Sequence, residues 1–382
     1  MTGTHALLSP SSSHRWLNCT ASPLLEAKVP NVDTDFTKEG TLAHAHCAYK
    51  LKCFLSLPTV AEEEEMAGLE DYYTGEMDEH TETYVNIILD KLEEAKERTK
   101  DAQLLVETRL DFSKYIPDSF GTADAIIIAD GLMEVIDFKY GKGVAVDANE
   151  NSQMMIYALG AYEAFSFEYN IKRVRMTIVQ PRLANLSEYE LDTKDLLLWA
   201  ETVLTPKSKE AASGKGQQKA GDWCRFCRVK ATCKAMAALA EDTCKDTDPR
   251  LLTPEEIAVN ILPHMDTIKS WLTSVEEYTL QQALDGTRYP GYKLVEGRSV
   301  RKIADADAML KALTDSGCKE EDVMRAPELR TLTDLEKLVG KKKLADIGGE
   351  LIVKPAGKPT LVPESDKRPA LNSAEEDFKG IN

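Results

Sequence analysis

The stretch "GTADAIIIADGLMEVIDFKYG" (residues 121–141) decides the fold, because it reads as two apolar strands joined by a tight turn. Apolar and β-branched residues dominate "TADAIIIA" (122–129) and "LMEVIDFK" (132–139), as is typical of short strands. The dipeptide Asp130-Gly131 between them is the strongest short-range signal for a β-hairpin. We therefore expect these residues to form adjacent antiparallel strands.

The hairpin brings three charged side chains to one face of the sheet. With the dipeptide in the turn, Ala129 lies opposite Leu132, and counting back along both strands places Asp124 opposite Asp137. Lys139 follows two residues later and points to the same face. Opposed carboxylates repel, and a divalent cation between them removes that repulsion. The hairpin thus predicts a Mg²⁺ or Mn²⁺ site that activates water, which Lys139 would orient; a surface ladder of charges, or a register shifted by a bulge, is the alternative.

Neighbouring segments add candidates to this site. The predicted strand "LLVETRLDF" (104–112) carries Glu107, a possible third acid. The predicted helix over 149–166 carries Gln153 and Tyr157, which share a helix face because they are four residues apart.

The tripeptide Asp-x-Lys also occurs at Asp192–Lys194 and at Asp377–Lys379. The first has no identified neighbouring strand, and the second falls in a charged tail. Hairpin context, and not the tripeptide, therefore selects the site.

The charge is unevenly distributed along the chain. The net charge of −17 argues against nucleic-acid binding. However, residues 62–82 contain ten acids and no Lys or Arg, whereas residues 207–234 contain eight Lys and Arg. The simplest interpretation of the acidic block is a solvated helix face. No apolar run approaches the roughly 18 residues that span a bilayer, and no secretion signal is evident, so we expect a cytoplasmic protein with no membrane contact.

Periodicity predicts the other elements and the domains. It indicates helices over 11–26 (capped by the serines at 11–13), 38–56, 60–100 and 193–213, a strand over 173–181, and a helix opened by the capping box "TPEEI" at 253–257 and ending near 284. We expect one domain over 1–240 with an acidic helical insertion at about 60–100, an accessory region, mostly helical with short strands, over 245–350, and a poorly ordered tail over 355–382.

Eight cysteines include the spacing C-x₂-C-x₅-C in "WCRFCRVKATC", at Cys224, Cys227 and Cys233. A fourth thiolate would complete a [4Fe–4S] or a zinc site, and the spacing does not choose between them. Cys19 is the strongest candidate for the fourth ligand, and Cys244 is the local alternative. Unrelated thiols are the competing interpretation.

Several motifs resemble a known superfamily. "EGTLAH" (39–44), "GTADAI" (121–126), "VIDFKYG" (135–141) and "QMMIY" (153–157) resemble, in order and spacing, the motifs of PD-(D/E)XK nucleases of the RecB-like branch. The remote Cys19 and the cysteine cluster resemble its iron–sulfur variants, the CRISPR-associated exonucleases among them. "LSPSSSHRWLNC", "GTADAIII" and the C-terminal tail resemble an uncharacterised phage and prophage family of this branch.

The resemblance implies an α/β fold: a central mixed β-sheet flanked by helices, as in restriction endonucleases, with a Cys₄ iron–sulfur lobe. It implies His44, Asp124, Asp137 and the Phe138 backbone carbonyl as metal ligands. It implies Lys139 as the catalytic lysine and the Gln153 and Tyr157 helix motif as the group that positions DNA. Glu107 is a further catalytic candidate.

The resemblance also implies a [4Fe–4S] cluster rather than zinc, held by the four cysteines and structural in role. The basic stretch around it supplies the expected DNA contacts: Lys215, Lys219, Arg225, Arg228 and Lys230. Trp223 and Phe226 would either stack on bases or pack around the cluster.

These features predict a metal-dependent DNA exonuclease that acts on single strands or duplex ends in phage replication or recombination, in the bacterial host cytoplasm. A phage single-strand-binding or recombination protein is a candidate partner. The alternative is a non-catalytic iron–sulfur scaffold that binds DNA or protein, which the −17 charge favours.

Overall fold

The computed structural model describes residues 6–31, 33–245, 251–297, 301–325, 328–329, 332–353, 357–363 and 369–370. The chain divides into two compact units, Met1–Trp271 and Leu272–Asn382. The division falls within helix α11 (Leu262–Leu284), later than the sequence-based boundary at 240–245.

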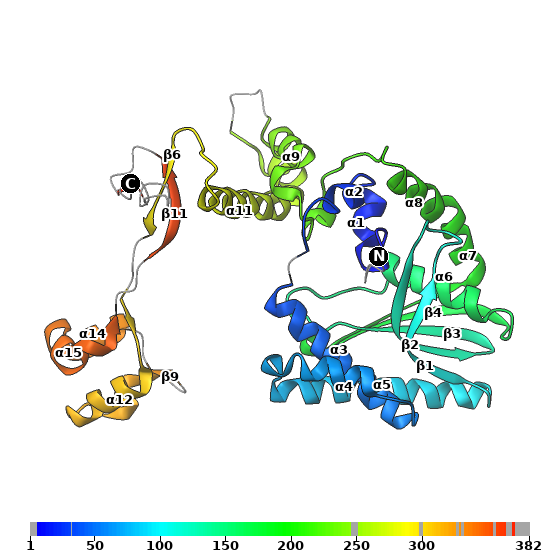
Figure 1. Ribbon diagram of the computed structural model, residues 1–382, viewed down its shortest axis with the longest axis horizontal. Helices are drawn as coiled ribbons and strands as arrows, with labels where there is room; N and C mark the ends of the chain where they lie inside the picture. Colours follow the sequence, from blue (N-terminus) through cyan, green and yellow to red (C-terminus); the bar gives the residue numbers. More distant parts are fainter. Residues whose placement is uncertain are drawn as a thin grey trace, which may run out of the picture. The chain divides into compact units, whose positions relative to one another are not determined.

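A five-stranded sheet in the order β1-β2-β3-β4-β5 forms the centre of the first unit (Figure 1). Its strands are β1 (Gln103–Asp111), β2 (Phe120–Ala129), β3 (Gly131–Phe138), β4 (Ile171–Gln180) and β5 (Asn185–Asp192). β3 and β4 are parallel, and the other neighbours are antiparallel. The predicted mixed sheet of an α/β fold is therefore confirmed.

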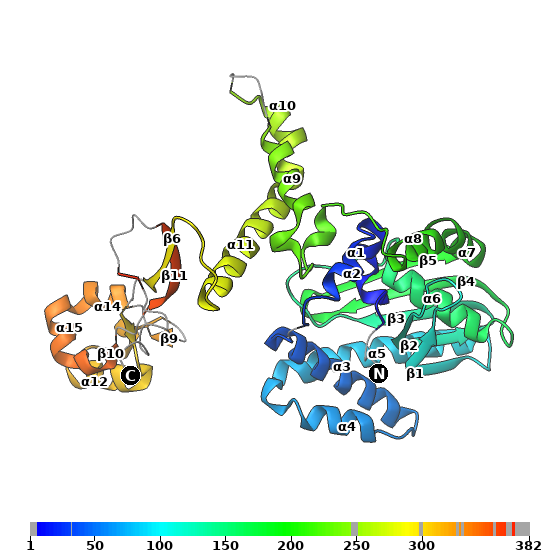
Figure 2. The same ribbon diagram turned by 45° about the horizontal axis from the view of Figure 1, so that its top comes forward.

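Helices cover both faces of this sheet (Figures 1 and 2). α6 (Ser152–Phe165) connects β3 to β4 and packs in one core cluster with Val135. α3 (Asp35–Phe54) and α5 (Gly75–Arg98) pack in a second cluster with Ile136. Successive strand residues point to opposite faces, so a continuous apolar strand supplies both clusters.

The hairpin forms in the predicted register. Ala129 pairs with Leu132, and the ladder continues as far as Ala125 and Ile136. Gly131 adopts a φ of +86°, a conformation that glycine adopts without steric strain. The local turn signal was therefore sufficient to set the pairing.

The single helix expected over 11–26 is wrong. A 3₁₀ turn (Pro10–Ser12) leads into α1 (Ser13–Asn18), and a separate helix, α2 (Ser22–Glu26), follows. Non-helical backbone at Cys19 (φ −128°, ψ 84°) ends α1, and the proline at position 23 occupies the first turn of α2, where a proline is tolerated. The expected serine cap is also absent: the Ser12 hydroxyl donates to the Ser9 carbonyl instead.

The remaining elements of the first unit follow the predictions, except that a helix over 234–244 and one strand were not predicted. They are α4 (Val60–Ala67), α7 (Thr193–Trp199), a π-helical turn (Ala200–Leu204), α8 (Thr205–Ala212), α9 (Lys234–Cys244), α10 (Pro254–Glu256) and a second π-helical turn (Ile257–Ile261). The capping box between Thr253 and Glu256 is confirmed. Strand β5 was not predicted, and Asp192 of the second Asp-x-Lys tripeptide ends it.

The second unit contains short strands and helices. They are β6 (Tyr292–Gly297), β7 (Lys302–Ile303), α12 (Ala306–Asp315), α13 (Glu320–Val323), β8 (Met324–Arg325), β9 (Glu328–Leu329), α14 (Leu332–Val339), α15 (Lys341–Gly348), β10 (Ile352–Val353) and β11 (Gly357–Pro363). β11 pairs with β6, so part of the stretch expected as a poorly ordered tail is a strand. Asp377–Lys379 lies outside the described residues.

Candidate active site

Three acids from three neighbouring strands follow one another across the sheet. Glu107 of β1 and Asp124 of β2 occupy the position between two regular pairs of their ladder, and Asp137 comes directly after the last β2–β3 pair. Glu107 has a left-handed φ of +48°, which is unusual for a residue other than glycine and coincides with the gap in the ladder. Asp124 does not pair with Asp137 through the backbone; its Oδ2 accepts a 2.7 Å hydrogen bond from the Phe138 N–H.

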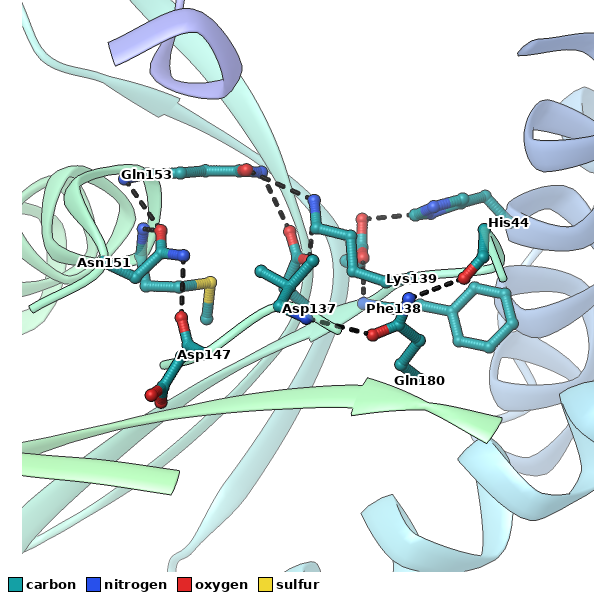
Figure 3. Close-up of polar contacts among 12 residues, drawn as sticks. His44, Asp137, Phe138, Lys139, Asp147, Asn151, Gln153 and Gln180 are labelled. Atoms are coloured by element: carbon teal, nitrogen blue, oxygen red, sulfur yellow. Dashed lines mark hydrogen bonds and ion pairs between the residues drawn. The ribbon is translucent and has the colours of Figure 1, made fainter. Parts of the chain in front are cut away.

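His44 of α3 reaches this row of acids from the opposite side to α6 (Figure 3). Its Nδ1 lies 3.3 Å from Oδ1 of Asp124, and its ring packs edge-on against Phe138. Burial lowers the pKa of His44, but the Asp124 carboxylate outweighs it and raises the pKa to about 9. Burial likewise raises the pKa of Asp124, but the His44 charge and the Phe138 N–H hold that pKa below its usual range. The two side chains therefore form an ion pair.

Lys139, Asp137 and Gln153 form a triangle at the end of β3 (Figure 3). Lys139 Nζ lies 2.9 Å from Asp137 Oδ2 and donates a 3.2 Å hydrogen bond to Gln153 Oε1. Gln153 Nε2 donates a 2.9 Å hydrogen bond to Asp137 Oδ1. Burial and the nearby Asp124 raise the pKa of Asp137 although Lys139 opposes them. Burial lowers the pKa of Lys139, but the carboxylates overcome it, so Lys139 is a cation.

The pKa of Glu107 shows how burial and a neighbouring acid act on this row of carboxyl groups when no cation is bound. Burial and the charge of Asp124 raise the pKa of Glu107 to about 8, against the opposing effect of His44 and Lys52. Glu107 is therefore protonated at neutral pH in the metal-free protein, because closely spaced carboxylates do not all ionise.

The chemistry of this donor set suits a hard divalent cation: carboxylate oxygens and one imidazole. Asp137 Oδ2 is buried and, apart from its ion pair with Lys139, has no hydrogen-bond partner within the described chain. Over the residues that the structure describes, no three or more His, Cys, Asp or Glu side chains are grouped closely enough to hold a metal ion. A bound metal would therefore require these side chains to close around it.

Two residues that the sequence did not single out position the site. The Asn151 side chain caps α6 by accepting from the N–H groups of Gln153 and Met154. Gln180, at the end of β4, donates to the carbonyls of Gly141 and Val144 and so anchors the loop after Lys139. The signal for Asn151 was present, because an Asn before an apolar helical run is a typical N-cap.

The motif "EGTLAH" is tied to the same region through Glu39. Its carboxylate lies 3.0 Å from the guanidinium of Arg182, whose side chain covers the ring of Tyr140. This ion pair joins α3 to the turn after β4, and no local sequence pattern predicts it.

Tyr157 lies one turn after Gln153, as its spacing predicts, but its ring is buried beside Phe112. The Tyr157 hydroxyl nevertheless lies near the site, because burial and the charge of Asp137 raise its pKa while Gln153 lowers it.

The four predicted cluster cysteines line one small cavity. Cys19, Cys224 and Cys227 are buried, and Cys233 is half-buried. The Lys219 N–H donates to Cys19 Sγ at 3.5 Å. Burial raises the pKa of Cys227 to about 11, so its thiol keeps its proton unless a metal binds.

Backbone contacts hold the two parts of this cysteine set together. The Ala21 N–H donates to the Gln217 carbonyl, and the Gln217 N–H donates to the Thr20 hydroxyl. At Gly216 a Cβ would lie 2.3 Å from the Thr20 carbonyl, so only glycine fits that approach. These contacts bring Cys19 to the distant cysteines; the side chain of Cys244, the local alternative, lies outside the described residues.

The five predicted DNA-binding residues differ in what they contact. Lys215, Lys219 and Arg225 are exposed. Arg228 donates to the Val29 carbonyl, and Lys230 donates to the Arg225 carbonyl, so these two also hold local structure.

The two aromatic residues near the cysteines, Trp223 and Phe226, also differ in their surroundings. Trp223 donates from its indole nitrogen to the Lys219 carbonyl and packs over Gly221. Phe226 is 75% exposed, which contradicts packing around a cluster for that ring.

Comparison with known proteins gives a family but no activity. No helix in the described ranges combines the length and apolar character that crossing a bilayer requires. Among solved structures, the crystal structure of SSO0001 matches 56% of this chain and 95% of its own, at 15% identity and a TM-score of 0.23, too low to support an inference. The nuclease activity thus stays a prediction. The model of the family described as "Protein of unknown function (DUF2800)" matches residues 5–369, and the chain belongs to that family.

Proposed function

We propose that this protein is a Mg²⁺- or Mn²⁺-dependent deoxyribonuclease of the PD-(D/E)XK type that hydrolyses phosphodiester bonds. The arrangement of Asp124, Asp137 and Lys139 at the end of the hairpin carries this proposal. Two buried acids and an ammonium group held in one place are the parts that metal-assisted phosphodiester hydrolysis needs.

Each side chain has a distinct role in the proposal. His44, Glu107, Asp124, Asp137 and the Phe138 carbonyl would hold the cation. Once bound, the metal would supply an activated water and neutralise negative charge on the phosphate. Lys139 would stabilise the charge that develops on the phosphate. Gln153 holds the Lys139 side chain in position by accepting its 3.2 Å hydrogen bond.

The substrate and cofactor parts of the proposal rest on the resemblance and on the basic surface residues. We assign exonuclease action on single strands or duplex ends in phage DNA replication or recombination. The four thiols lining one cavity support a structural [4Fe–4S] cluster, with zinc as the alternative. A brown colour and visible absorption after oxygen-free purification would distinguish iron–sulfur from zinc.

The proposal is tested by incubating the protein with end-labelled single-stranded and duplex DNA in Mn²⁺, with a chelator as control. We expect metal-dependent degradation that Asp137→Asn abolishes. Binding without any cleavage would instead support the non-catalytic scaffold, which the net charge of −17 favours.

A further inference from the structure

A cleft of about 480 Å³ lies beside the cysteine cavity in the first unit. One wall is the serine-rich turn with Ser9, Ser11 and Ser12, and the other carries Phe226 and Arg228. We call this feature the serine cleft. Its volume is that of a small-ligand pocket, so it suits a nucleotide-sized group rather than a duplex.

The serine cleft is attached to the candidate active site. Directly after the serine-rich turn, the hydroxyl of Ser13 lies 2.7 Å from the hydroxyl of Ser152. Ser152 is the first residue of α6, and Gln153 follows it with hydrogen bonds to Asp137 and Lys139. The turn that lines the cleft is therefore hydrogen-bonded, through the next residue along the chain, to the start of the helix that carries Gln153.

The polar groups of the cleft suit a phosphate backbone. Arg15 and Arg228 both line it, and they share one carboxylate, Glu26, so the cleft keeps a net positive charge in an acidic protein. Arg15 Nε donates to Glu26 at 2.8 Å, and the Arg228 N–H donates to the same group at 2.9 Å, which fixes this wall. Ser22 also lines the cleft; it is 2% exposed, and its hydroxyl has no hydrogen-bond partner within the described chain.

The apolar element of the cleft suits a base. Phe226 is 75% exposed, although an aromatic ring is normally buried. A base can stack on an exposed ring whatever its identity, while hydroxyl and guanidinium groups contact the phosphates.

We propose that the serine cleft binds a short stretch of single-stranded DNA, with a base stacked on Phe226. This inference deepens the proposed function and rests on it, because it names the strand form that the active site receives. Duplex DNA does not fit the cleft and is expected to bind independently of Phe226.

Fluorescence anisotropy of a labelled oligothymidine, with the full-length protein and no added divalent metal, tests the proposal. Phe226→Ala should weaken binding about tenfold, as expected for the loss of one base–aromatic stack. Phe226→Trp should bind the oligothymidine about as tightly as the wild-type protein, because it keeps an aromatic ring at this position. Phe167→Ala is the matched control, because Phe167 is 98% exposed and does not line the cleft, and it should leave the affinity unchanged.

The outcomes separate the cleft from the nuclease. Equal oligothymidine affinity for wild type, Phe226→Ala and Phe167→Ala would overturn the cleft, even if the protein degrades DNA. A tenfold loss confined to Phe226→Ala would support the cleft, even if no preparation cuts DNA with Mn²⁺. If Phe226→Ala lost affinity equally for single-stranded and duplex DNA, that result would also overturn the proposal for the serine cleft.

Discussion

At Asp124, burial and charge act in opposite directions. Burial favours the neutral acid, whereas His44, the Phe138 N–H and Lys139 favour the carboxylate and lower its pKa. Across the ladder, Glu107 has less compensation, and its pKa rises to about 8. The metal-free site thus balances its charges with protons, which a divalent cation would displace.

This balance predicts that metal affinity depends on pH. His44 and Glu107, with pKa values of about 9 and about 8, must both lose a proton to become ligands. The affinity for Mn²⁺ should therefore rise with pH, by about tenfold per unit for each proton released. Titration calorimetry over neutral to mildly alkaline pH measures the dependence, and His44→Gln should make it shallower.

An affinity that does not change with pH would contradict this assignment.

In the metal-free protein, the contribution of His44 to the stability of the fold falls as the pH rises, whereas the metal affinity rises. The raised pKa of His44 stabilises the fold fully below its ordinary value of 6.5, and that contribution is lost as the pH rises through about 9.

Single residues also show where sequence reasoning ends. The spacing predicted that Asp137 and Lys139 share a face of the sheet and made Gln153, on the following helix, a candidate for the same site; the structure brings the three together. Gln180 was missed because its role depends on a loop 39 and 36 residues before it, at Gly141 and Val144. A buried polar side chain of this kind has no local sequence signature.

At the scale of elements, the acidic insertion contributes a buried group to the surroundings of the site. Glu62 of α4 is buried and pairs with Lys52 of α3, and both influence the pKa of Glu107. The interpretation of the acidic block 62–82 as a solvated helix face is therefore wrong for Glu62, which is buried. The Lys52–Glu62 pair fastens α4 to α3 beside the acids.

Glu62→Ala should lower the free energy of unfolding by about 3 kcal/mol, because it leaves Lys52 partly buried without its partner. Glu64→Ala is the matched control on the exposed side of α4 and should change it by less than about 0.5 kcal/mol. Urea unfolding of both variants measures the difference. Similar small changes in both variants would show that the pair does not fasten the helix.

Local signals predicted most elements correctly. The Asp-Gly turn fixed the β2–β3 register, and the capping box fixed the start of α10. Strands β5 and β11 were missed because each is completed by pairing with a partner elsewhere, β4 and β6, and their own sequences carry many polar residues or prolines. The serine cap failed because Pro10 starts a 3₁₀ turn instead.

At the scale of the molecule, the N-terminal segment closes against a region about two hundred residues away. Figure 2 shows α1 and α2 beside α8, and this contact brings Cys19 to the cavity shared with Cys224, Cys227 and Cys233. No sequence spacing could establish that contact. Cys19 was the strongest candidate for the fourth ligand, with Cys244 as the local alternative, and the resemblance supported Cys19.

If these thiols hold a cluster or zinc, Cys19→Ser should lose most of the bound metal and lower the melting temperature, because the metal ties the N-terminus to the rest of the unit. Cys53→Ser is the control, since Cys53 is an exposed thiol of α3. Elemental analysis after oxygen-free purification, with thermal unfolding, measures both effects. Equal metal content in the two variants would exclude Cys19 as a ligand.

The central claim is that one Asp-x-Lys of the three is a catalytic site, and the chain contains its own control. Lys139 meets Asp137 and Gln153 at the end of β3, whereas Lys194 is exposed in the same tripeptide after β5. The most direct measurement is the rate of Mn²⁺-dependent nucleotide release from labelled DNA by Lys139→Ala and Lys194→Ala. We expect at least a roughly hundredfold loss for Lys139→Ala and the wild-type rate for Lys194→Ala. Wild-type rates for both variants, or no release by the wild-type protein, would contradict the account.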